Sequence, residues 1–206
     1  MDTTKAIKPM KRKDLRNFVL AAMFSALIIV MTVVPYTGYI TAGVVEITTL
    51  HIVVAIGATL LGWKYGAFLG LVWGLTCMIR AFTNPLWIMF TNPLISVLPR
   101  ILVGLVAGLV FEALSKNKSL SSWVCALIAA VAGTLTNTVL VLSAMYIFGG
   151  MFESYAAFFE LFKTIFTTLI SLNGVIELVA AAIITPLVYK VAAPVWLKQQ
   201  NMSGAN

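Results

Sequence analysis

The chain has 206 residues, of which 61% are hydrophobic and only 10% are charged, and its mean hydropathy is +1.00. A soluble domain carries about 25% charged residues, so this chain cannot hide its apolar surface without a bilayer around it. The net charge of +7 lies mostly in short segments between apolar runs. That distribution indicates membrane topology and argues against a soluble enzyme or a nucleic-acid-binding protein.

Six apolar runs predict six transmembrane helices, because each span needs about 20 apolar residues. We expect an all-α membrane protein whose single domain covers residues 15–198, between a basic N-terminus at 1–14 and a tail at 199–206. The N-terminus lacks a small-residue cleavage site, so we expect the first run to be retained. The expected spans are residues 15–34, 48–61, 65–82, 94–114, 123–148 and 169–191.

The connections between these spans carry signals of their own. Spans two and three are joined almost directly, so the sequence allows either a turn at Gly62 or one long merged helix. The aromatic and basic residues that follow Gly62 favour the turn. Asn-Pro pairs at 84–85 and 92–93 are expected to mark helix boundaries, because proline disfavours helix at the preceding residue. The aromatic stretch 151–168 predicts an amphipathic or re-entrant helix at the membrane interface.

Lysine and arginine are concentrated on one side of the expected membrane. With six spans, both termini lie on the side that carries Lys5, Lys8, Lys11, Arg12, Lys13, Arg16, Lys64, Lys116, Lys118, Lys190 and Lys198. The opposite side carries Arg80, Arg100 and Lys163. Because basic loops stay inside the cell, we expect a multi-pass protein of the cell membrane with both termini in the cytoplasm.

Polar side chains within the expected spans gather in the outer half of the membrane. At about 1.5 Å of rise per residue, Arg100 and Asn137 lie there, and Glu112 is the charge near the inner end. A pore needs polar residues through its full depth, whereas a pocket open to the outside needs this one-sided pattern. We predict substrate contacts from Arg100, Asn137, Asn173, Glu177, His51 and Thr48, and from Asn92, Trp87 and Tyr39 in the loops 37–46 and 84–92 expected to cover the pocket.

Sequence spacing places several of these residues on shared helix faces. Thr48 and His51 are expected to open the second span one turn apart. Asn173 and Glu177 are expected to share a face near the outer end of the last span. Close helix packing is expected at the small residues Gly66, Gly70, Gly74, Gly104 and Gly108.

Six of the nine predicted contacts have a structural alternative that the sequence leaves open. Arg100 can snorkel to the outer headgroups, and Glu177 can simply pair with Arg100 or Arg80. The two asparagines can form hydrogen bonds between helices. His51 can be a packing residue, and Trp87 can belong to the aromatic belt at the interface.

Motifs for chemistry are absent from the sequence. It contains no Gly-x4-Gly-Lys-Ser/Thr loop, no Gly-x-Ser-x-Gly and no His-Glu-x-x-His. One histidine and two separated cysteines disfavour a zinc site. Its aspartates, Asp2 and Asp14, both lie at the basic N-terminus, outside the expected spans. We therefore expect a protein that is not an enzyme, holds no cofactor and needs an energising partner for active uptake.

Four stretches of the chain carry a family resemblance. They are Ala22-Met23-Phe24-Ser25-Ala26, Thr48-Thr49-Leu50-His51-Ile52, the run from Ile56 to Gly62 with Tyr65-Gly66, and Asn92-Pro93-Leu94-Ile95-Ser96-Val97-Leu98-Pro99-Arg100 with Gly104 behind it. Together they resemble the S components of energy-coupling factor (ECF) transporters, most clearly over residues 20–110. The resemblance implies six helices and capture of a vitamin from the outside.

The resemblance also implies partners. In that family, small residues such as Ala22 and Ala26 pack the first span against a transmembrane T subunit, and two ATPase subunits complete the complex. The S component would topple in the membrane when ATP is used by these partners. Membrane lipid is the remaining expected neighbour.

The second and fourth stretches are most similar to those of pantothenate S components. Pantothenate carries a carboxylate, an amide and two hydroxyls, so Arg100 would receive the carboxylate and Asn137, Asn173 and Thr48 the other groups, with Glu177 orienting an asparagine or accepting a hydroxyl proton. Riboflavin, hydroxymethylpyrimidine and folate stay open as ligands, as do a stand-alone small-solute transporter and a structural subunit. Whether Arg80, where the family usually has a neutral polar residue, contacts ligand also stays open.

Overall fold

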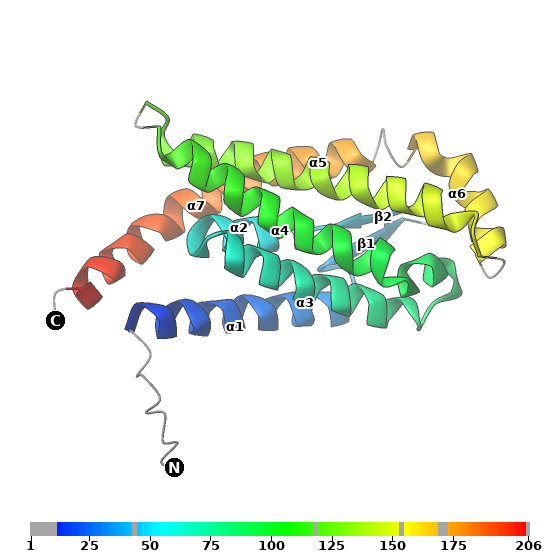
Figure 1. The fold of residues 1–206 in the computed structure, drawn as a ribbon, viewed down its shortest axis with the longest axis horizontal. Coiled ribbons are helices and arrows are strands. Elements are labelled where there is room, and N and C mark those ends of the chain that lie inside the picture. The colour runs from blue at the N-terminus through cyan, green and yellow to red at the C-terminus, as the bar shows by residue number, and fades with distance from the viewer. Residues whose placement is uncertain (1–11, 43–44, 118, 153–154, 169–172, 205–206) are drawn as a thin grey trace, which may run out of the picture.

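The computed structural model of the chain describes residues 12–42, 45–117, 119–152, 155–168 and 173–204. Long helices run side by side along one axis, and α1 begins where α7 ends, at the same end of the bundle (Figure 1). These helices are α1 (Arg12–Val33), α2 (Leu50–Leu61), α3 (Trp63–Ala81), α4 (Pro93–Ser115), α5 (Ser122–Gly149) and α7 (Val175–Gly204). The succession of apolar runs in the sequence therefore corresponds to successive passes along the bundle.

Shorter elements gather toward the opposite end of the bundle (Figure 1). Strands β1 (Tyr39–Ala42) and β2 (Val45–Thr48) form an antiparallel hairpin in which Thr41 faces Glu46. The 3-10 helix η1 (Pro85–Thr91) precedes α4, and helix α6 (Ala156–Thr168) follows α5. The Asn-Pro pairs thus mark boundaries as expected, since η1 and α4 each begin at the proline.

The hairpin corrects two expectations. The fold is not purely α-helical, because the expected loop 37–46 is largely strand, rich in the β-branched and aromatic residues that favour a pleated surface. Thr48 accordingly lies in β2 and does not open the second span with His51, since α2 begins at Leu50. Helix α7 also runs to Gly204, well past the expected end of the last span at 191, whereas the expected start at 169 lies outside the described residues.

Gly62 separates α2 from α3. Its φ of 95° lies in the left-handed region, which glycine adopts without a steric penalty from a Cβ. The expected turn is confirmed, and a single merged helix over both segments is wrong. This turn lets α2 and α3 run back along each other.

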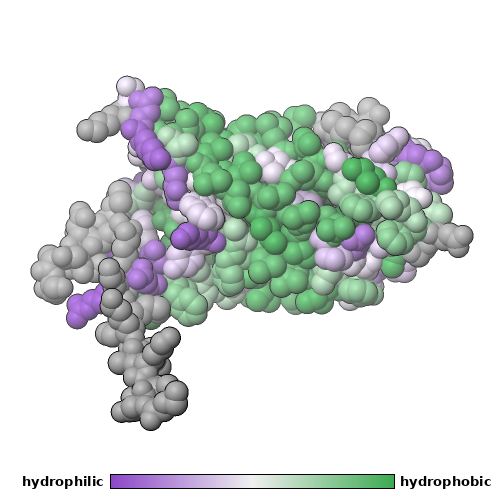
Figure 2. Space-filling model, viewed as in Figure 1, coloured by the Kyte–Doolittle hydropathy of each residue, from purple (hydrophilic) through white to green (hydrophobic). Residues whose placement is uncertain are grey.

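Four helices within the described part of the chain are long and apolar enough to cross a membrane. They are Asp14–Val33, Pro93–Ser115, Ser122–Gly149 and Val175–Trp196. Helix α2 has only 12 residues, nearly all buried, as expected for a helix that is apolar on every side. On the face shown in Figure 2, a broad hydrophobic band crosses the middle of the molecule, with hydrophilic side chains toward both ends.

The contact between α3 and α4 is a direct approach of two backbones. A Cβ added to Gly66 would collide with the carbonyl of Gly104, and one added to Gly104 would collide with Gly66. A Cβ on Gly70 would meet the carbonyl of Arg100. The expected packing of small residues is thus confirmed, and it places the backbone of Arg100 firmly against α3.

We expect Gly104→Ala to destabilise the protein by about 1–3 kcal/mol, because the added methyl forces the helix backbones apart. The measurement is thermal unfolding in detergent, followed by intrinsic fluorescence. Gly150→Ala is the matched control, since the nearest atom to its Cβ is a Phe159 ring carbon at 3.4 Å. Equal melting temperatures for the two variants would contradict the proposed backbone contact.

Candidate functional site

A cavity lies among the hairpin, α3, η1, α4, α5 and the start of α7. Its lining includes seven of the nine residues predicted to contact substrate: Tyr39, Thr48, Trp87, Arg100, Asn137, Asn173 and Glu177. These residues come from positions as distant as 39 and 177, so only the folded bundle brings them together. Their contact with a substrate stays a prediction.

The other two predicted residues do not line this cavity. Asn92 caps α4, where its Oδ1 accepts a hydrogen bond from the backbone N–H of Leu94 at 3.0 Å. His51 is buried in α2, with 1% of its surface exposed. His51 does not reach the cavity because α2 begins at Leu50, and the His51 side chain is buried among the helices instead.

Arg100 provides a buried cation at the cavity. Its side chain is turned into the bundle with 5% of its surface exposed, so snorkelling to the headgroups is excluded. Nη1 donates to the carbonyl of Ile95 at 2.8 Å, and the guanidinium lies 5.2 Å from the ring centres of both Trp73 and Phe90. Nε is buried without an acceptor, and an anionic ligand would relieve that cost.

Asn137 and Asn173 provide unsatisfied acceptors. The Oδ1 atom of each is buried and has no hydrogen-bond partner. Asn173 uses its Nδ2 to donate to the carbonyl of Glu46 at 2.8 Å, which fixes the direction in which its oxygen points. A ligand with hydroxyl or amide N–H groups would satisfy these oxygens.

Glu177 fastens the hairpin to α7. Its Oε1 accepts a hydrogen bond from the backbone N–H of Thr48 at 2.7 Å, and its side chain is buried. Among the described residues, ion pairs within 4 Å join Arg80 to Glu46 and Lys163 to Glu160. The alternative in which Glu177 pairs with an arginine is therefore wrong.

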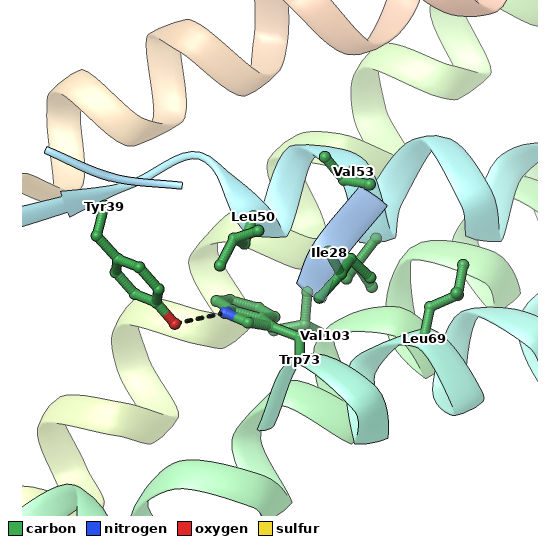
Figure 3. Close-up of a cluster of buried hydrophobic side chains, with 8 residues drawn as sticks. Ile28, Tyr39, Leu50, Val53, Leu69, Trp73 and Val103 are labelled. Carbon is green, nitrogen blue, oxygen red and sulfur yellow. Dashed lines mark hydrogen bonds between the residues drawn. The ribbon is translucent and has the colours of Figure 1, made fainter. Parts of the chain in front are cut away.

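Tyr39 connects the hairpin to the core of the bundle. The Nε1–H of Trp73 donates to its hydroxyl oxygen at 3.2 Å, beside the buried cluster that includes Ile28, Leu50 and Val103 (Figure 3). Burial raises the pKa of the Tyr39 hydroxyl well above its ordinary value. The hydroxyl is therefore neutral at physiological pH, and the Tyr39 side chain lines the cavity.

Glu46 and Arg80 form an ion pair in the cavity lining that the sequence did not assign, and we call these two residues the rim. Arg80 Nη2 and Nη1 donate to the two carboxylate oxygens of Glu46 at 2.6 and 2.8 Å, and Thr41 donates to the same carboxylate at 2.9 Å. The Arg80 guanidinium also stacks 4.3 Å from the ring centre of Tyr39. Glu46 was missed because its partner depends on the hairpin register, although both residues line the cavity.

The apolar wall of the cavity was also missed. Apolar residues inside a span look alike whether they face lipid, core or ligand. One signal was present, because Val141 and Met145 follow Asn137 at four-residue intervals on α5 and share its face. All three line the cavity.

Ala22 and Ala26 lie away from the cavity, one turn apart and exposed on α1. Neighbouring exposed side chains on α1 are apolar, among them Phe18, Met23 and Leu27. This surface faces the surroundings of the bundle and is free for lipid or a partner. Within the part of the chain that the structure describes, no group of three or more His, Cys, Asp or Glu side chains could hold a metal ion.

Comparisons with known proteins identify relatives of nearly the whole chain. Residues 16–189 match the family described as ECF transporter, substrate-specific component. The chain is 31% identical over 213 residues to the pantothenic acid transporter PanT of Lactococcus lactis subsp. cremoris, covering 94% of this chain and 100% of that protein. It is 38% identical over 117 residues to the pantothenate transporter PanT of Leuconostoc mesenteroides, where the alignment spans 53% of this chain and 57% of the relative.

Two solved structures share the fold. The S-component for biotin from an ECF-type ABC transporter matches with a TM-score of 0.57 at 14% identity, over 89% of this chain and 95% of that one. ThiT from Listeria monocytogenes matches with a TM-score of 0.50 at 17% identity, over 93% of this chain and 98% of that one. These likenesses concern the fold, and they agree with a mostly helical S-component bundle.

We expect Glu177→Leu to speed hydrogen exchange at the Thr48 amide by about 10- to 100-fold, because that buried N–H loses its acceptor. Exchange is read by mass spectrometry on a peptide spanning β2. Glu177→Gln is the control, since its side-chain oxygen keeps an acceptor in place. Equal protection in the wild type and the leucine variant would show that Glu177 does not fasten the hairpin.

Proposed function

We propose, from the premise that this chain belongs to the substrate-specific (S) components of ECF transporters, that it captures pantothenate from outside the cell. Membership of a transporter family also means that the chain is not an enzyme. The relatives named PanT support pantothenate as the ligand.

The observation that carries the proposal is the set of unsatisfied polar atoms in one cavity. Arg100 offers a buried guanidinium without an ion pair among the described residues, and two asparagine oxygens lack donors. A ligand that satisfies all three needs one carboxylate and several hydroxyl or amide N–H groups. Pantothenate has one carboxylate, an amide N–H and two hydroxyls.

The assignment of contacts follows from that chemistry. Arg100 would receive the carboxylate, with the neutral Tyr39 hydroxyl as a further donor. Asn137 and Asn173 would accept from the hydroxyls and the amide. The apolar wall with Val141 would contact the dimethyl group of the ligand.

The topology supports capture on one side of the membrane. We infer six passes in which the short α2 is shielded by its neighbours, so that its 12 residues need not face lipid along their length. The end that holds the start of α1 also carries Arg12, Lys64 and Lys190, and basic residues favour the cytoplasm. The cavity then opens to the outside.

Uptake requires energy that this chain does not supply. We propose that a transmembrane T subunit docks on α1 and that two ATPase subunits hydrolyse ATP, with no cofactor held by the S component itself. Ala22 and Ala26 would be the points of closest approach, because small side chains let helix backbones come together in a bilayer.

Mass spectrometry of ligand released from the purified protein tests the vitamin directly, and calorimetry measures its affinity. Pantothenate in the released fraction and binding in the nanomolar to micromolar range are expected. Release of riboflavin, hydroxymethylpyrimidine or folate would replace the assignment. Uptake by liposomes that contain this chain alone would favour a stand-alone transporter.

We expect Arg100→Met to weaken pantothenate binding by about 10- to 100-fold, because a charge-assisted hydrogen bond and its ion pair are lost. Isothermal titration calorimetry gives the dissociation constants. Lys163→Met is the control, since Lys163 is exposed on α6 and pairs with Glu160 outside the cavity. An unchanged affinity in Arg100→Met would remove this residue from the site.

We expect Ala22→Trp combined with Ala26→Trp to abolish co-purification with the T subunit while leaving pantothenate affinity unchanged. Large side chains at these positions hold the partner helix away from α1. Val191→Trp, at a position 76% exposed on α7, is the control. Intact complexes with the doubly substituted chain would place the partner surface elsewhere.

A further inference from the structure

Four charged side chains belong to the described lining of the cavity: Glu46, Arg80, Arg100 and Glu177. Glu46 and Arg80 neutralise each other through two parallel hydrogen bonds of 2.8 and 2.6 Å. Side-chain exposure is 9% for Glu46 and 29% for Arg80, so water screens the pair incompletely. Glu177 is engaged with the backbone of Thr48, which leaves Arg100 as the lining cation without an ion pair among the described residues.

We infer that Glu46 and Arg80 tune the selection of ligand charge: as an internal ion pair they keep the rim neutral, so that the preference of the cavity for an anion depends on Arg100 and Glu177 and not on the rim. This inference rests on the proposed function and assigns specificity to two residues that it did not use. Charges interact strongly at low effective dielectric. A rim charge without its partner would therefore add to the field of Arg100 or oppose it.

The geometry favours a role in charge over a role in shape alone. The hairpin has other attachments to the helices, through Tyr39 with Trp73, Thr48 with Glu177, and the carbonyl of Glu46 with Asn173. The last of these uses backbone at position 46, so a side-chain substitution there leaves it in place. Planar, two-bond pairing is the arrangement in which arginine and a carboxylate hold each other most firmly.

Removing either member should shift ligand preference in opposite directions. Arg80→Gln leaves the Glu46 carboxylate uncompensated beside the site, and it repels an anionic ligand. Glu46→Gln leaves the Arg80 guanidinium uncompensated, and it attracts one. The double variant with both glutamines has a neutral rim again, as the wild type does.

The experiment compares pantothenate with pantothenol, the neutral analogue in which CH2OH replaces the carboxylate. Calorimetry gives the ratio of the pantothenol to the pantothenate dissociation constant for each protein. We expect this ratio to fall about tenfold in Arg80→Gln, to rise in Glu46→Gln and to return to the wild-type value in the double variant. Thr41→Val removes a hydrogen bond to Glu46 without changing charge, so its ratio should equal that of the wild type.

The outcomes distinguish a failure of this inference from a failure of the proposed function. Wild-type protein that binds neither compound overturns both. Wild-type protein that prefers pantothenate, with the same ratio in all four variants, overturns only the charge role of Glu46 and Arg80. A double variant whose ratio departs further than either single variant would show that the pair acts through hairpin structure, and this too overturns the inference.

Discussion

The backbones of α3 and α4 touch through their glycines, and the position of Arg100 depends on that contact. Gly70 lies against the carbonyl of Arg100, and Gly66 lies against Gly104 one turn further along α4. With α4 held in this register, the guanidinium lies 5.2 Å from the ring centres of Trp73 and Phe90 and is buried in the bundle. Burying an arginine is costly in a bilayer, so tight packing of small residues is needed to hold this charge at the cavity.

The hairpin depends on the helices in turn. Two strands alone are at best marginally stable, and here side chains of α3 and α7 hold them. Glu177 accepts a hydrogen bond from the backbone N–H of Thr48, and Trp73 donates a hydrogen bond to the Tyr39 hydroxyl. The same side chains line the cavity or contact residues that do, so the attachment of the hairpin and the construction of the site are one arrangement.

Most of the helical fold was predictable, because a membrane span requires a long apolar run that is visible in the sequence. Apolar runs, the turn at Gly62 and the proline boundaries marked the helices, and depth along each helix brought Arg100 and Asn137 together. The hairpin was not predictable from periodicity, since four-residue strands are too short to show a clear alternation of polar and apolar residues. Thr48 and His51 were therefore placed on one helix, although Thr48 is a strand residue at the cavity and His51 is packed in α2.

The same reasoning explains why Glu46 escaped notice while Arg100 did not. A charged residue inside an apolar run is conspicuous, because the run predicts burial in the membrane and burying a charge there is costly. A charge in a polar connection looks like a solvated one until the chain folds over a cavity. Register then decides its environment: pairing Thr41 with Glu46 directs that carboxylate toward Arg80 on α3. A polar connection that composition would class as solvent-exposed thus supplies a charge to the cavity lining, while the apolar helices hold Arg100 in position.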